Sequence, residues 1–252
     1  MDIVYVTASP KSSGSASLLM LERVRASAPG EIWTLAPGSP PSPGGWDGLL
    51  AADAVVLSFP LYVDHLPAPL LECLEEAAAR CASAREADPA APLPRLYAVI
   101  NNGFYEPEHC LTAAGALRLF CRDSGMTWSG ALMAGGGPVI SSAPGLFRAG
   151  VFPFGRIRRA LRAFARKVAA LEDAGELGVR LPVPRRLYVF MANTYWKILA
   201  RKNRVPAASL YCPALVPEGG DAPGKPDGKE LPEPAGQDDP KSPEDPKSPE
   251  GQ

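Results

Sequence analysis

Short apolar runs recur along the first two-thirds of the chain, separated by longer segments in which apolar and polar residues alternate. Residues 2–8 form a run rich in β-branched residues, and residues 54–59 and 96–100 are continuously apolar, as in strands buried on both faces. Residues 31–35 and 128–134 have similar character. The pattern predicts five short strands.

Apolar residues at helical spacing fill the intervals between these runs. They predict helices over residues 15–28, 46–52, 68–83, 108–124 and 156–171. Strand and helix therefore alternate, which predicts a parallel sheet with right-handed crossovers and helices on both faces.

The pattern changes after residue 178, and we divide the chain there. Residues 1–178 are expected to form the α/β domain, and residues 179–215 a helical extension packed on it, with its helix at 185–203. Residues 216–252 are dominated by Pro, Gly and charged residues, and Asp-Pro-Lys-Ser-Pro-Glu occurs there twice. Such a segment buries too little apolar surface to offset its ordering entropy, so we expect a disordered acidic tail.

The formal net charge of −1 is unevenly distributed. From Glu218 to the end, ten acidic residues face four lysines, a net of −6, which leaves +5 on the preceding residues. A near-neutral chain argues against a nucleic-acid-binding protein, and a mildly basic body suits phosphorylated ligands.

Five scattered cysteines without a C-x-x-C pair argue against a disulfide framework or a zinc site. The N-terminal run lacks the basic start of a signal peptide, and no apolar segment is long enough to span a bilayer. We therefore expect a reduced, cytoplasmic protein with no metal site and no stable membrane insertion.

The loop after the first predicted strand carries the strongest chemical signal. In a doubly wound sheet, ligands bind beyond the carboxyl ends of the strands. The segment Ser9-Pro-Lys-Ser-Ser-Gly-Ser-Ala-Ser17 leads straight into a helix there, so backbone amides, hydroxyls and Lys11 could surround a phosphate at the positive end of the helix dipole. A simple Ser15 N-cap explains one of the serines only. We predict a phosphate site.

Three further loops follow the third, fourth and fifth predicted strands. Pro60-Leu-Tyr-Val-Asp64 can supply an apolar wall and backbone groups for a planar ring, or form an ordinary proline-rich turn. Asn101-Asn-Gly-Phe-Tyr105 tolerates left-handed backbone and could turn its amides toward a ligand, or simply cap the next helix. Gly135-Gly-Gly137 allows close backbone approach.

Taken together, these segments resemble the flavodoxin-like NAD(P)H-dependent FMN reductases and quinone reductases. The resemblance continues through residues 121–130, and Asn193-Thr-Tyr-Trp196 with Arg201-Lys-Asn203 is similar to a C-terminal extension in one bacterial branch. It implies a five-stranded parallel sheet of order 2-1-3-4-5, bound FMN, NADPH or NADH as electron donor, and a possible homodimer. By this resemblance the cofactor-binding residues are Ser9, Lys11, Ser15, Ala16, Ser17, Pro60, Leu61, Tyr62, Val63, Asn101, Asn102, Gly103, Phe104 and Gly136. Lys11 stands where the family often has arginine.

The resulting hypothesis is an FMN-dependent oxidoreductase that takes hydride from NAD(P)H and reduces a small acceptor such as a quinone or a flavin. No catalytic side chain is assigned, because the cofactor carries the chemistry; Tyr62, Asp64 and His65 are the nearest proton-handling groups. His109 is expected to be structural. Two alternatives remain: a flavodoxin-type electron carrier, and an interaction protein that has lost its cofactor.

The predicted helix at 156–171 is strongly basic, with Arg156, Arg158, Arg159, Arg162, Arg166 and Lys167. A solvated helix face is the simplest interpretation. An anionic membrane, a protein partner or the adenosine phosphate of NADPH are the alternatives.

Overall fold

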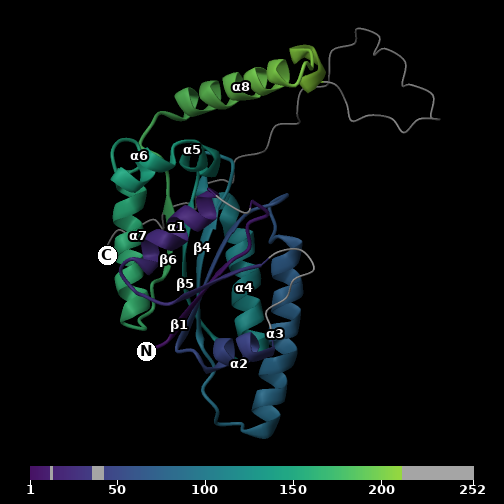
Figure 1. Ribbon diagram of the computed structural model, residues 1–252, viewed down its shortest axis with the longest axis vertical. Coiled ribbons are helices and arrows are strands. Elements are labelled where there is room, and N and C mark those ends of the chain that lie inside the picture. The colour runs from purple at the N-terminus through teal and green to yellow at the C-terminus, as the bar shows by residue number, and fades with distance from the viewer. Residues whose placement is uncertain (12–13, 36–42, 212–252) are drawn as a thin grey trace, which may run out of the picture. The chain divides into compact units, whose positions relative to one another are not determined.

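A six-stranded parallel sheet organises the chain in the order β2-β1-β3-β4-β5-β6 (Figure 1). The structure is a computed structural model that describes residues 1–11, 14–35 and 43–211. Every neighbouring pair of strands is parallel, so all six carboxyl ends lie at one edge of the sheet. The strands are β1 (Ile3–Thr7), β2 (Glu31–Thr34), β3 (Ala54–Pro60), β4 (Arg95–Asn101), β5 (Thr127–Ala134) and β6 (Glu176–Val179).

Helices cover both faces of this sheet (Figure 1). On one side lie α1 (Ala16–Arg25), α5 (Gly137–Ser142), α6 (Pro144–Ala149) and α7 (Gly155–Ala169). On the other lie α2 (Pro43–Ala51), α3 (Ala68–Ala87) and α4 (Leu111–Ser124), the last preceded by the 3₁₀ turn η1 (Pro107–Cys110). The chain continues through α8 (Arg185–Lys202) and η2 (Ala207–Tyr211).

The two-residue period of the strands divides the interior into two cores. In β1, Ile3 and Tyr5 join the core under α1 and α7, whereas Val4 and Val6 join the core under α2, α3 and α4. Successive side chains of a strand point to opposite faces of the sheet, and helices cover both faces. The central strands are therefore apolar on both sides. The continuous apolar runs of the sequence follow from this arrangement.

The predicted strand order 2-1-3-4-5 is confirmed, and the fold is flavodoxin-like. The sheet nevertheless has a sixth strand, β6, which pairs with β5 at the edge and crosses position 178. Helix α3 runs four residues further than expected, to Ala87 rather than Ser83, and α2 begins at Pro43 rather than Trp46. Helices α5 and α6 occupy a stretch for which no element was expected.

The chain divides into two compact units, Met1–Ile198 and the part from Leu199 onward. In the second unit, the end of α8 is closed by a hydrogen bond from the Val205 amide to the Ala200 carbonyl, and η2 follows. The predicted acidic tail lies outside the described residues. Within the described part of the chain, no helix is long and apolar enough to cross a membrane.

Candidate functional site

The predicted site loops meet at one edge of the sheet. They follow β1, β3, β4 and β5, which are consecutive neighbours in the sheet. Because the strands are parallel, the four loops emerge side by side. The structure therefore brings together, at the level of the backbone, all four segments that the sequence singled out.

The loop after β1 delivers two unbonded amides at the start of α1. Ser15 is the N-cap, and its hydroxyl accepts the Leu18 amide at 3.1 Å while its carbonyl accepts the Leu19 amide. The amides of Ala16 and Ser17 have no acceptor among the described residues, as is usual in the first turn of a helix. These amides are the ones left for an anion.

The rest of this loop is polar. Lys11 is exposed, and its amide donates to the nearly buried Ser9 hydroxyl at 3.3 Å. Beneath the loop, the buried Thr7 hydroxyl at the end of β1 has no hydrogen-bond partner within the described structure. An orphaned hydroxyl at the carboxyl edge of a parallel sheet fits a site that a polar group completes. Ser12 and Ser13, which the sequence placed in this loop, lie outside the described residues.

Asn101 joins three of the loops. Its side-chain amide donates to the Ser17 hydroxyl at 2.7 Å and to the Phe59 carbonyl at 3.2 Å, and the residue is 3% exposed. Its carbonyl accepts the Leu61 amide at 2.8 Å. Asn101 and Ser17 were predicted to face the cofactor. The structure shows their polar groups bonded to each other, which fixes the first turn of α1 against the ends of β3 and β4.

The loop after β3 ends in a tight turn with an unusual backbone. Tyr62 and His65 exchange both backbone hydrogen bonds at 3.0 Å, and the two residues between them, Val63 and Asp64, have φ of 49° and 56°. Asn and Gly usually occupy such a turn, and a β-branched residue with positive φ is an outlier. Val63 is also 100% exposed, and Tyr62 is exposed beside it. Strain of this kind concentrates at ligand-contacting sites.

The loop after β4 is held by Asn102. Its side-chain amide donates to the Glu106 carbonyl at 2.8 Å, its side-chain oxygen accepts the Phe104 amide at 2.9 Å, and its backbone bonds to Ala134 and Gly137. All polar groups of Asn102 are therefore used within the protein. This arrangement turns Gly103 and Phe104 to the surface, and the Gly103 amide has no acceptor in the part of the chain that the structure covers.

The glycines after β5 are required by close packing. An added Cβ would lie 2.2 Å from the Tyr105 carbonyl oxygen at Gly135 and 2.4 Å from the Asn101 side-chain oxygen at Gly137. The Gly136 amide donates to the Phe104 carbonyl at 2.7 Å. Gly136, predicted to contact the cofactor, thus has its amide engaged with the neighbouring loop.

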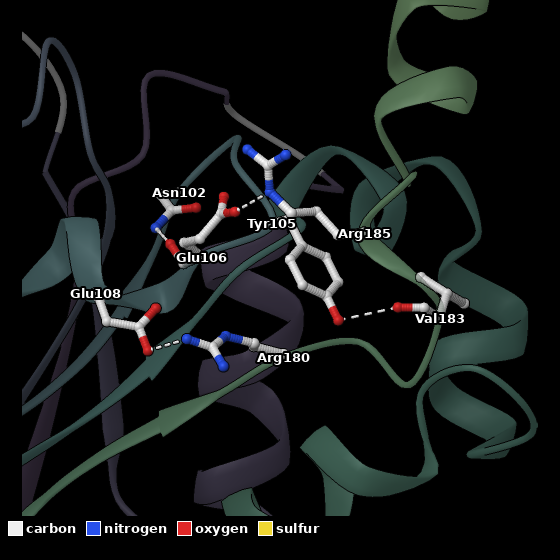
Figure 2. Close-up of polar contacts among 7 residues, drawn as sticks. All are labelled: Asn102, Tyr105, Glu106, Glu108, Arg180, Val183 and Arg185. Atoms are coloured by element: carbon white, nitrogen blue, oxygen red, sulfur yellow. Dashed lines mark hydrogen bonds and ion pairs between the residues drawn. The ribbon is translucent and has the colours of Figure 1, made fainter. Parts of the chain in front are cut away.

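A segment that the sequence did not connect to the site fastens the loop after β4 (Figure 2). Tyr105 donates its hydroxyl to the Val183 carbonyl at 2.9 Å, and Arg185 reaches Glu106 at 2.5 Å. Arg180 pairs with Glu108 in the same way, and the pKa of each glutamate is lowered chiefly by its arginine. In addition, the Tyr188 hydroxyl donates to the Gly103 carbonyl at 2.8 Å. We call residues 179–188 the strap.

Of the three predicted proton-handling groups, Asp64 alone lines a polar hollow. This hollow of about 530 Å³ is lined by Asp64, Glu106, Glu108, His109, Thr112 and Arg180. His109, expected to be structural, stacks on Phe104 with ring centroids 4.5 Å apart and lies 3.8 Å from Asp64. The ring nitrogen of His65 instead accepts the Leu66 amide at 2.9 Å.

The four cysteines among the described residues are buried. Cys110 lies under the loop after β4, accepts a hydrogen bond from Asn102, and has its pKa raised by burial to about 12. Cys73, Cys81 and Cys121 are likewise buried with raised pKa values. Among the described residues, no three His, Cys, Asp or Glu side chains are grouped to hold a metal ion.

Solved structures share this fold at low sequence identity. No protein-family model matches the chain, and no curated protein matches its sequence. The NADPH-quinone reductase from P. pentosaceus matches with a TM-score of 0.50 and 16% identity, over 67% of this chain and 98% of that one. The NAD(P)H:quinone oxidoreductase from Methanothermobacter marburgensis matches at 0.41 and 17%, over 64% and 94%. The azoreductase from Bacillus anthracis matches at 0.41 and 16%, over 67% and 99%. The likeness to the P. pentosaceus structure, at 16% identity, supports the flavodoxin-like fold and nothing beyond the fold.

Proposed function

From this fold and this edge we propose that the chain binds FMN and acts as an NAD(P)H-dependent oxidoreductase on a small acceptor such as a quinone, a flavin or another electron-poor compound. The observation that carries the proposal is that free backbone amides and exposed apolar side chains occur together at the carboxyl edge of the sheet. The amides of Ala16 and Ser17, which have no acceptor among the described residues, lie at the start of α1, and exposed apolar side chains lie on the loops after β3 and β4. An anion site beside an apolar wall matches a phosphorylated, planar aromatic ligand.

The phosphate end of FMN would be held by the loop after β1. The amides of Ala16 and Ser17 and the helix dipole supply the positive end, and Lys11 adds a mobile point charge. Ser9 supplies a hydroxyl. The unpaired Thr7 hydroxyl beneath the loop supports the fit, because a polar group that enters there would satisfy it. Ser15 contributes by capping the helix, which fixes where the amides point.

The ring end would lie against the loops after β3 and β4. Tyr62 and Val63 on one loop and Phe104 on the other are large apolar side chains left in water. Pro60, the last residue of β3, and Leu61 form the base of the loop after β3. The free Gly103 amide is a donor for the polar edge of the ring, and Asn102 and Gly136 hold that loop in place.

Bound FMN supplies the redox chemistry, accepting hydride from the nicotinamide and passing electrons to the acceptor. The chain contributes binding, orientation and exclusion of water. No protein acid or base is required for this transfer. The nicotinamide donor is NADPH or NADH, and a homodimer in which a second copy covers the ring belongs to the same proposal.

The test is a flavin titration followed by reduction. We expect saturable binding of FMN to the purified chain, and Lys11→Ala should weaken it about three- to tenfold, because one charge-assisted contact is worth about 1 kcal/mol at an exposed site. Lys167→Ala, which changes an exposed lysine in the last turn of α7, is the matched control and should leave the affinity unchanged.

Anaerobic mixing with NADPH and NADH then separates the alternatives. Bleaching of the flavin absorbance by either donor supports the oxidoreductase. Saturable binding without bleaching would leave the electron carrier, and absence of binding would leave an interaction protein on the same fold.

A further inference from the structure

The first four turns of α8 carry many large apolar side chains in water. Tyr188 and Ala192 face the core under α1 and α7. Most of the other large side chains of this stretch are 39–67% exposed, namely Leu187, Phe190, Met191, Tyr195, Trp196 and Ile198. Soluble surfaces rarely expose a contiguous patch of this kind unless something covers it.

Four of the exposed apolar residues form a stripe along α8, and polar residues lie on another side of the helix. Leu187, Met191, Tyr195 and Ile198 recur at intervals of four, four and three residues, so they lie along one side of the helix. Arg186, Asn193 and Lys197 recur at intervals of seven and four on another side. We call these two sides the apolar stripe and the cationic face of α8. Phe190 and Trp196 are exposed outside the stripe.

The charge of this region has one sign only. Residues 177–217 contain seven arginines and lysines and not one acidic residue, and Arg180 and Arg185 are the two of the seven that pair with glutamates of the loop after β4. A second copy of α8 would bring no acidic residue to pair with these cations. An anionic surface complements them instead. Tyrosine and tryptophan next to cations are the residues that prefer the boundary between lipid head groups and acyl chains.

We propose that α8 docks the protein on an anionic phospholipid bilayer, with the apolar stripe at the level of the head groups and the cationic face paired with lipid phosphates and carboxylates. The helix lies in the plane of the interface and does not cross it, consistent with its polar side. Docking of this kind combines apolar burial with a salt-sensitive electrostatic attraction. The inference is independent of flavin binding.

The test is co-sedimentation of the full chain with vesicles. We expect binding to vesicles of phosphatidylcholine mixed with phosphatidylserine at low salt, weaker binding at high salt, and little binding to phosphatidylcholine alone. The variant Met191→Gln with Ile198→Gln should bind about tenfold more weakly or worse, since it removes two apolar side chains without changing charge. Leu111→Gln with Leu119→Gln makes the same change at two exposed positions of α4 and should bind like the unmodified chain.

The electrostatic part has its own pair of variants. Arg186→Gln with Lys197→Gln should lower both the affinity and its salt dependence, whereas Arg159→Gln with Arg166→Gln on α7 should have the smaller effect. Circular dichroism checks that each variant is folded. The proposal is overturned if the chain stays in the supernatant with anionic vesicles at low salt, or if the α4 or α7 pair matters as much as the α8 pairs. It is equally overturned if the α8 variants act only by dissolving a vesicle-independent dimer.

Discussion

Replacing Asn101 by alanine should destabilise the protein by about 2–4 kcal/mol. The change removes two buried hydrogen bonds, to the Ser17 hydroxyl and to the Phe59 carbonyl, each contributing about 0.5–1.5 kcal/mol, and it opens a small void at a position 3% exposed. Urea unfolding followed by circular dichroism measures the effect. With a slope of about 2–3 kcal/mol per molar, the midpoint should fall by about 1 M.

A double-mutant cycle isolates the bond between loops. Ser17→Ala alone should cost about 1 kcal/mol, because the Ser17 carbonyl still accepts from Ser58. In the Asn101→Ala background the same change should cost much less, giving a coupling free energy of about 0.5–1.5 kcal/mol. If the two effects instead add to within about 0.3 kcal/mol, the hydrogen bond does not couple the loops and the role assigned to Asn101 is wrong.

Three further predictions concern the site and its surroundings. Gly137→Ala should lower the unfolding midpoint strongly, because its Cβ would lie 2.4 Å from the Asn101 side chain, whereas Gly145→Ala in α6 meets nothing within 4 Å and should be neutral or stabilising by up to about 1 kcal/mol. A thiol reagent at pH 8 should titrate at most one of the five cysteines in the native protein and all five in denaturant, since burial raises the pKa of four of them; rapid reaction of two or more would contradict this. The Glu108–Arg180 pair, whose folded-state carboxyl pKa is lowered, should be intact above the ordinary value of 4.5 and lost as the pH falls through the folded value. The protection factors of the strap amides, which correct for the slower intrinsic exchange in acid, should therefore fall as the pH is lowered, and in Glu108→Gln they should be lower already at neutral pH; a strap equally protected in both proteins would refute the role of the pair.

Strands β1, β3, β4 and β5 could be predicted because each is a short apolar run between polar turns and is buried on both faces. The edge strand β2 was also predicted, although it is only partly buried. Strand β6 could not be predicted. Its four residues, Glu-Leu-Gly-Val, are too few for an alternating pattern to stand out, and only Val179 among them is buried. Its approach to β5 relies on Gly130, where a Cβ would lie 2.3 Å from the Gly175 carbonyl oxygen. Helices α5 and α6 have six residues each, too few for a helical period to show.

The position of the site followed from topology, since loops after parallel strands meet at one edge. The roles of individual side chains did not follow. Whether Asn101 faces a ligand or Ser17 depends on packing across 84 residues of sequence, and the ties of the strap span 72 to 85. Pairs so distant leave no local pattern. One hint of the strap is present in the sequence: after the last predicted strand, the chain continues with arginines and a tyrosine at 180, 185 and 188.

The strap has a practical consequence for anyone who wants to graft this edge onto another sheet. Four side-chain ties, from Tyr105, Arg180, Arg185 and Tyr188, reach between residues 179–188 and the loop after β4. A design that copied only the strands and their loops would include every backbone turn named above and yet leave the Gly103 carbonyl and two glutamates without their partners. The smallest transplantable piece therefore ends no earlier than Tyr188.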